Sequence, residues 1–137
     1  MKKLASLAVT FTFGMAVLSL PTLALAQATL VELGDTGELT GAGVVVPVTV
    51  ACMDDSRSAD VEVQLVQGSA GGEGDLDFED IPEKCPSTPQ TVHVLVRPFG
   101  PQFIVGSATA DAVLGACDST GRNCNVPRVS GTINIVD

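Results

Sequence analysis

Residues 44–52 read Val-Val-Val-Pro-Val-Thr-Val-Ala-Cys, and their alternation decides the fold class. Four valines and Cys52 occupy every second position, while Pro47, Thr49 and Ala51 stand between them. A period of two with β-branched residues on one face is typical of a strand that buries one of its faces. This stretch therefore predicts a half-buried β-strand that ends in a cysteine.

The same alternation continues along the chain, and no segment favours a helix. Residues 68–74 are rich in glycine and are expected to form a flexible loop, and residues 98–101 a tight corner. Short strands with glycine and proline between them predict an all-β fold, namely an antiparallel immunoglobulin-like β-sandwich of about seven strands. The expected strands are residues 44–52, 60–67, 91–97, 103–116 and 129–136, with 29–33 and 38–39 supplying a first strand or two.

The N-terminus has the features of a secretory signal peptide. Lys2 and Lys3 precede an uncharged apolar stretch, and the sequence Ala-Leu-Ala at residues 24–26 suits a signal peptidase. We expect cleavage between Ala26 and Gln27, which leaves residues 27–137 as a single domain in an extracellular or periplasmic location. The alternative, a retained membrane helix, is disfavoured because no basic stop-transfer cluster follows the apolar stretch.

Four cysteines follow the leader, and they are expected to form two structural disulfides. Three pairings are conceivable. We favour Cys117 with Cys124, which closes a short loop, and Cys52 with Cys85, which joins a strand end to the loop before residue 91. The alternative joins Cys52 to Cys117 as in immunoglobulin domains, but the chain has no tryptophan to pack on such a bridge.

The charge of the chain is strongly acidic, which narrows the classes of partner. Its 16 acidic and 7 basic residues give a net charge of −9, which becomes −11 when Lys2 and Lys3 leave with the leader. The remaining basic residues are scattered, so nucleic acid and anionic membranes are poor partners for the mature chain. Acidity of this kind is typical of a soluble exported protein, whose partner would be an extracellular or envelope protein.

The order of cysteines and strands resembles small exported bacterial domains of unknown function. The resemblance covers most of residues 40–136 and implies an immunoglobulin-like sandwich with four cysteines, but no established activity and therefore no functional residues. The chain departs from that pattern where Val92, His93 and Val94 replace the usual aromatic residue. A looser similarity to neocarzinostatin-type chromophore-binding sandwiches involves only the chain length and the loop between Cys117 and Cys124.

Two groups of residues are candidates for chemistry. Asp75, Asp77 and Glu79 alternate in an acidic run, and calcium prefers several such oxygen ligands, although the run fails the EF-hand pattern. His93 is the only histidine, and a hydrolase would need it beside a serine or a carboxylate such as Asp111. We expect a solvated acidic loop and a solvated histidine, with no cofactor.

Few aromatic residues are available for recognition. The mature chain contains three phenylalanines and no tryptophan or tyrosine, which disfavours a lectin-like site. Phe99 and Phe103 are expected to plug the core at a corner of the sandwich. The sequence therefore predicts a non-enzymatic binding or interaction module. The alternatives are a calcium- or small-ligand-binding sandwich and, third, a secreted hydrolase or inhibitor.

Overall fold

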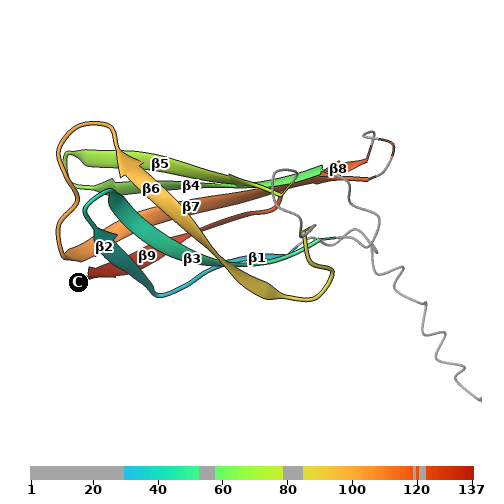
Figure 1. The fold of residues 1–137 in the computed structure, drawn as a ribbon, viewed down its shortest axis with the longest axis horizontal. Helices are drawn as coiled ribbons and strands as arrows, with labels where there is room; N and C mark the ends of the chain where they lie inside the picture. The colour runs from blue at the N-terminus through green and yellow to red at the C-terminus, as the bar shows by residue number, and fades with distance from the viewer. Residues whose placement is uncertain (1–29, 53–57, 79–84, 119, 121–122) are drawn as a thin grey trace, which may run out of the picture.

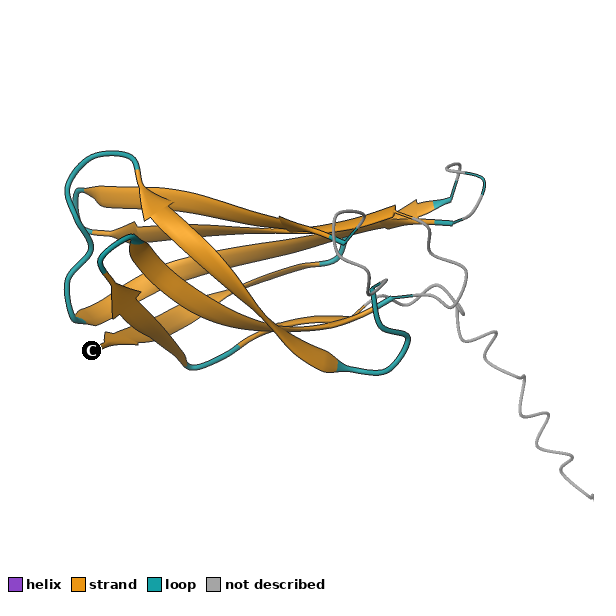
Figure 2. Cartoon of the chain, in the orientation of Figure 1, coloured by secondary structure: helices purple, strands orange, loops and turns teal. Residues whose placement is uncertain are grey.

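The computed structural model describes residues 30–52, 58–78, 85–118, 120 and 123–137. This part of the chain contains β-strands and no helix, so the fold is all-β (Figures 1 and 2). The predicted leader, residues 1–26, and the expected cleavage point between Ala26 and Gln27 lie outside the described residues. The strands are β1 (Leu30–Leu33), β2 (Thr36–Thr40), β3 (Gly43–Ala51), β4 (Ser58–Gln67), β5 (Ala70–Asp77), β6 (Gln90–Pro98), β7 (Gly106–Cys117), β8 (Cys124–Asn125) and β9 (Arg128–Val136).

Seven of these strands form a closed ring. Starting from β3, the hydrogen-bonded order is β3, β2, β9, β7, β4, β5 and β6, and β6 pairs again with β3. Neighbours in the ring are antiparallel except for β2 and β9, which are parallel. Outside the ring, β1 pairs with the C-terminal half of β3, and β8 with the end of β7. The predicted strands thus assemble into a closed barrel, where the sequence led us to expect two open sheets.

The core follows the predicted alternation. Valines 44, 46, 48 and 50 on β3 are fully buried, and so are Val61, Val63 and Leu65 on β4. On β7 the buried positions are Leu114 and four alanines, 108, 110, 112 and 116, so most of this wall of the barrel is lined by small side chains. All of these residues belong to one hydrophobic cluster, in which side chains fill the interior of a narrow barrel.

Strand β5 corrects the prediction of a flexible loop at residues 68–74. Only Gly68 and Ser69 turn the chain, and Gly68 adopts a left-handed conformation with φ of 58°. Gly74 lies against the backbone of β6, because a Cβ atom there would sit 2.7 Å from the carbonyl carbon of Leu95. Gly72 and Gly74 therefore serve a close approach of two strands, since a Cβ atom at either position would overlap the backbone of β6.

Both disulfides lie at one end of the barrel, and they confirm the cysteine pairing that the sequence favoured. Cys52 is bonded to Cys85, with Cα atoms 5.7 Å apart, and Cys117 to Cys124, with Cα atoms 4.0 Å apart. The first bridge is buried and is reinforced by the Cys52 amide, which donates to the carbonyl oxygen of Pro86 over 2.7 Å. Two disulfides are typical of a chain that folds in an oxidising, extracellular environment.

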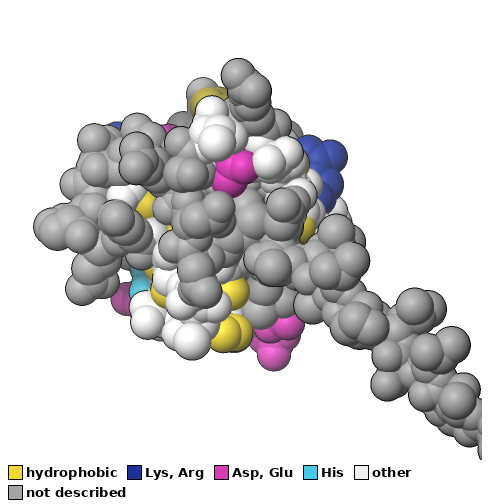
Figure 3. Space-filling model, turned by 90° about the vertical axis from the view of Figure 1, so that its right-hand side faces the viewer, with side chains coloured by type: hydrophobic (Ala, Val, Ile, Leu, Met, Phe, Trp, Pro, Cys, Tyr) yellow, Lys and Arg dark blue, Asp and Glu magenta, His cyan; other side chains and the backbone are white. Residues whose placement is uncertain are grey.

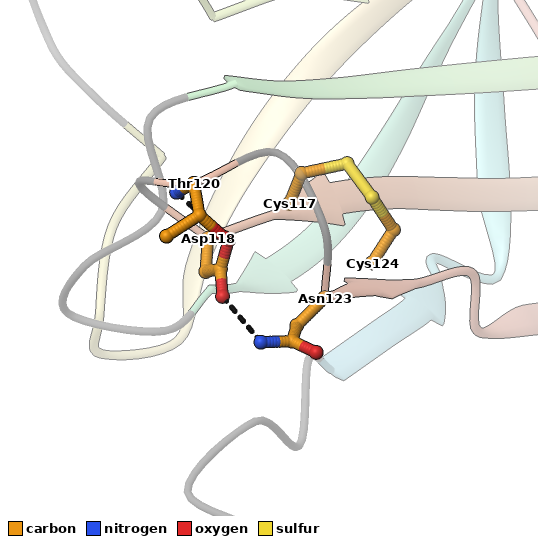
Figure 4. The surroundings of a disulfide bond; sticks show 5 residues. All are labelled: Cys117, Asp118, Thr120, Asn123 and Cys124. Carbon is orange, nitrogen blue, oxygen red and sulfur yellow. Dashed lines mark hydrogen bonds between the residues drawn. A yellow bond between two sulfur atoms is a disulfide. The ribbon is translucent and has the colours of Figure 1, made fainter.

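Asp118 organises the loop that the second disulfide closes (Figure 4). Its carboxylate accepts hydrogen bonds from the Thr120 hydroxyl (2.6 Å) and amide (2.9 Å) and from the Asn123 side-chain amide (2.6 Å). The hydrogen bonds from Thr120 and then Asn123 lower the pKa of Asp118 to about 2. Because this pKa is depressed, the stabilisation is present above the pKa of an unfolded aspartate and is lost as the pH falls toward about 2.

Candidate binding surface

Four apolar side chains are exposed together at the end of the barrel opposite the disulfides. Val66 on β4 is 55% exposed, and Phe99, Ile104 and Val105 in the β6–β7 connection are 76%, 66% and 50% exposed. The connection lies beside the β4–β5 hairpin, because the Phe99 amide donates to the carbonyl oxygen of Gly71 over 2.8 Å (Figure 1). We call these four residues the apolar tip. Grouped apolar exposure of this kind marks interaction surfaces in soluble proteins.

The Gln67 side chain holds the apolar tip in place. Its Nε2 donates to the carbonyl oxygen of Ile104 over 2.8 Å, and its Oε1 accepts from the Ile104 amide over 2.9 Å. Nε2 also lies 3.4 Å from the carbonyl oxygen of Ser107. This reciprocal pairing fixes the backbone between Phe103 and Ser107, so a partner would not have to order the connection on binding.

The two expected core plugs behave differently. Phe103 is 3% exposed and closes this end of the barrel, as predicted. Phe99 points into solvent, so its assignment to the core was wrong. The physical reason is that the corner places Phe99 just after the last β5–β6 pair, Gly72 with Pro98, where β6 leaves the ring.

The connections at this end carry no charged residue. They are residues 41–42 between β2 and β3, 68–69 between β4 and β5, and 99–105 between β6 and β7. A hollow of about 220 Å³ beside Val66 is also lined entirely by uncharged residues, namely Val66, Gln67, Gly68, Ser107, Ala108, Thr109 and Thr132. In a chain of net charge −9, such a depletion is typical of the centre of a protein–protein interface.

The opposite end has a different character. Seen from the disulfide end, the described surface shows both acidic and basic side chains (Figure 3). Val126, which follows β8, is 65% exposed there. The sequence pattern did not point to Ile104 and Val105 as exposed residues, because it predicts a strand over residues 103–116. The signal that finds them is the uncharged run from residue 98 to 110, which contains two prolines and two glycines.

Carboxylates gather on the outer face of β4 and β5, which we call the acidic face. Asp60 is paired across the strands with Asp77, and Glu62 with Asp75, so like charges face each other twice. Partial burial, and then the charges of Asp77, Glu62 and Asp75, raise the pKa of Asp60. Like charges directly opposite each other destabilise an antiparallel pair.

We expect Asp60→Asn to stabilise the protein near neutral pH. The raised pKa means that the charged form of Asp60 costs more in the folded than in the unfolded chain, so the cost is present above the folded pKa. It disappears as the pH falls below the pKa of an unfolded aspartate. Because Asp60 is exposed, the gain in unfolding free energy is about 0.5 kcal/mol. Urea midpoints of the wild type and Asp60→Asn, compared at pH 7 and at pH 3, measure this gain. Glu32→Gln, which removes a carboxylate on β1, is the control. A gain of the same size at both pH values would contradict this account.

The calcium candidates are only partly described. Asp75 and Asp77 lie on β5 with exposed side chains, and Glu79 lies outside the described residues. Within the described ranges, no three histidine, cysteine, aspartate or glutamate side chains form a group that could hold a metal ion. The calcium site therefore stays a prediction.

His93 lies on the outer face of β6, as the alternation predicts. It lines a hollow of about 290 Å³ together with Thr36, Glu38, Val45, Pro47, Val136 and Asp137, and no serine contributes. Asp111, the carboxylate that a catalytic pair would need, lies on β7 and forms an ion pair with Arg128 at 3.4 Å. The structure thus does not bring His93 and Asp111 together.

Comparison with known proteins adds no assignment. Neither the protein-family models nor the curated proteins include a match to this chain. In the part of the chain that the structure describes, no helix is long and apolar enough to span a bilayer.

Proposed function

We propose that this chain is an exported, non-enzymatic binding module that engages an extracellular or envelope protein through the apolar tip. The observation that carries the proposal is the 76% exposure of Phe99 on a connection fixed by the Gln67 side chain. A large aromatic side chain presented on a rigid, uncharged surface is a typical hot spot of a protein interface. Export is supported by the leader-like residues 1–26 and by the two disulfides.

The scaffold of this module is, in our proposal, an immunoglobulin-like sandwich closed at its edges. The ring is joined by few residue pairs at two sides: β5 meets β6 at two pairs on one side, and the short β2 meets β3 and β9 at three pairs each on the other. Between these junctions, β1, β3 and β6 form one layer, and β5, β4, β7 and β9 form the other. Short junctions between two longer paired layers favour a sandwich whose connections cluster at its ends, as in immunoglobulin domains that bind through loops.

Capture experiments with matched variants test the function. The mature, oxidised domain is used as bait against the envelope fraction and culture medium of the secreting cell, and captured proteins are identified by mass spectrometry. We expect Phe99→Ser to weaken capture of a specific partner about tenfold, as the loss of one hot-spot side chain does. Val126→Ser, which removes an apolar side chain that is 65% exposed at the other end, should leave capture unchanged. Equal capture by wild type and Phe99→Ser would overturn the proposal.

A further inference from the structure

One edge of β9 is open along the first half of the strand. On one side, β7 pairs with β9 from Arg128 to Ile135 without interruption. On the other side, β2 pairs only with residues 134–136 and lies beside the C-terminal end of β9 (Figure 1). Among the described residues, no strand pairing or backbone hydrogen bond joins this second side of residues 128–132 to another segment. An unpaired strand edge of this kind is a template for pairing with another chain.

The backbone groups of three residues point to this open edge. The Asn134 amide donates to the carbonyl oxygen of Asp35, just before β2, over 2.9 Å, so the backbone of Asn134 faces away from β7. Alternate residues of a paired strand direct their backbone groups to opposite sides. Because the register of β9 with β7 is unbroken, Arg128, Ser130 and Thr132 direct their amides and carbonyls to the same side as Asn134.

The inner face beside this edge contains a gap in the wall of the barrel. Gly131 faces inward, since it is paired with the fully buried Ala110 of β7, yet Gly131 itself is exposed. A Cβ atom at Gly131 would meet no heavy atom of another described segment within 4 Å. Val129 also faces inward and is only partly buried against the core. The edge therefore presents an aliphatic side chain and, two residues away, a hole.

The open edge carries no negative charge in an otherwise acidic chain. Residues 128–136 contain no aspartate or glutamate, although the chain has a net charge of −9. Arg128 forms an ion pair with Asp111 of β7 at 3.4 Å, and Ser130 and Thr132 are small, exposed and neutral. Natural edge strands are commonly protected from self-association by charged side chains, and the centre of this edge lacks that protection.

We propose that two copies of this chain form a dimer through the open edges of β9, paired antiparallel about a two-fold axis at Ser130. In this register Ser130 lies opposite Ser130 of the second copy and Arg128 lies opposite Thr132, so no like charges face each other. The same register places Val129 opposite Gly131, so the valine of each copy covers the hole of the other. A two-fold interface requires such self-complementarity. This surface is separate from the apolar tip, and the dimer does not rest on the proposed function.

The mature, oxidised domain alone tests the inference. Because the contact is between two short strand edges, we expect sedimentation equilibrium to show a reversible dimer with a dissociation constant on the order of 0.1 mM. Raising the protein concentration should protect the amides of Ser130 and Thr132 from hydrogen exchange. In a mixture of isotope-labelled and unlabelled protein, an NOE should join the methyl groups of Val129 in one copy to the α-hydrogens of Gly131 in the other.

Two variants separate edge pairing from other self-association. Ser130→Pro removes the central donor of both copies and should weaken the dimer at least about tenfold, while the monomer keeps its fold because this amide faces the open edge. Gly131→Val fills the hole within each copy, so it should keep the urea midpoint of the dilute monomer. The added side chain would overlap Val129 of the second copy, so this variant should also weaken the dimer at least about tenfold.

Phe99→Ser at the apolar tip and Gly71→Val, a strand glycine away from the edge, are the controls and should leave dimerisation unchanged. A chain that stays monomeric up to about 1 mM, or a dimer without the NOE between Val129 and Gly131, would overturn the inference. So would a dimer that Phe99→Ser dissociates and Gly131→Val does not, since that result would place the contact at the apolar tip.

Discussion

Gly74→Ala is expected to destabilise the protein by about 3 kcal/mol, the upper part of the range for forced overpacking. A methyl group at this position would overlap the carbonyl oxygen of Leu95 and lie 3.1 Å from the Cα atom of Val96. These are backbone atoms of β6, so they cannot move aside as the end of a flexible side chain can. To accept the methyl group, β6 must shift away from β5, and the barrel opens where only two pairs of residues hold these strands together.

The neighbouring Gly71→Ala is the matched control. It lies in the same strand, but a methyl group there meets nothing closer than the carbonyl oxygen of Leu65 at 3.8 Å. We expect it to be neutral or to stabilise by about 0.5 kcal/mol, because alanine restricts the unfolded chain more than glycine does. Urea denaturation followed by circular dichroism compares the two variants. If Gly74→Ala were as stable as Gly71→Ala, then β5 and β6 would not be in close contact.

Removal of the disulfide between Cys52 and Cys85 is expected to cost about 4 kcal/mol, and removal of that between Cys117 and Cys124 about 2.5 kcal/mol. The bridges span 33 and 7 residues of sequence, and the longer loop loses more conformational entropy when it is closed in the unfolded chain. The first bridge is also buried, so its loss leaves poorly filled space at the end of the core.

Double serine variants of each pair test this order. Cys52→Ser with Cys85→Ser should lower the urea midpoint more than Cys117→Ser with Cys124→Ser, and in the first variant most of the folded state should be lost near 37 °C. The second variant should keep the barrel and lose order mainly in the loop that Asp118 organises. A larger loss of stability in the second variant would show that the short loop, and not the long one, holds the fold together.

Local periodicity predicted most of the strands, though not β5, because each of them buries one face. The inward valines of β3 and the inward alanines of β7 could be identified from alternation alone, and both are buried. The favoured disulfide pairing could also be predicted from the sequence. Cys117 and Cys124 are separated by only 7 positions, and in the structure they lie directly opposite each other on β7 and β8. These features depend on residues that are close together in the sequence or on the closure of one short loop, the one between Cys117 and Cys124.

Features that depend on contacts between distant segments could not be predicted in the same way. Glycine is common both in flexible loops and where two backbones meet, so Gly74 gave no local sign that β6 lies against it. The burial of Phe103 and the exposure of Phe99 likewise depend on where β6 leaves the ring, which the pairing with the distant strand β5 decides. Closure of the barrel follows from the pairing of β3 with β6, strands far apart in the sequence.

Site-specific photocrosslinking in the secreting cell tests the central claim, that the protein binds through the apolar tip. A benzophenone analogue of phenylalanine replaces Phe99 in one variant and Val126 in another, and both side chains are exposed, at opposite ends of the barrel. We predict that irradiation joins the Phe99 variant to a specific protein of the envelope or medium and that the Val126 variant gives no such adduct. Adducts from the Val126 variant alone, or none from the Phe99 variant, would contradict the account.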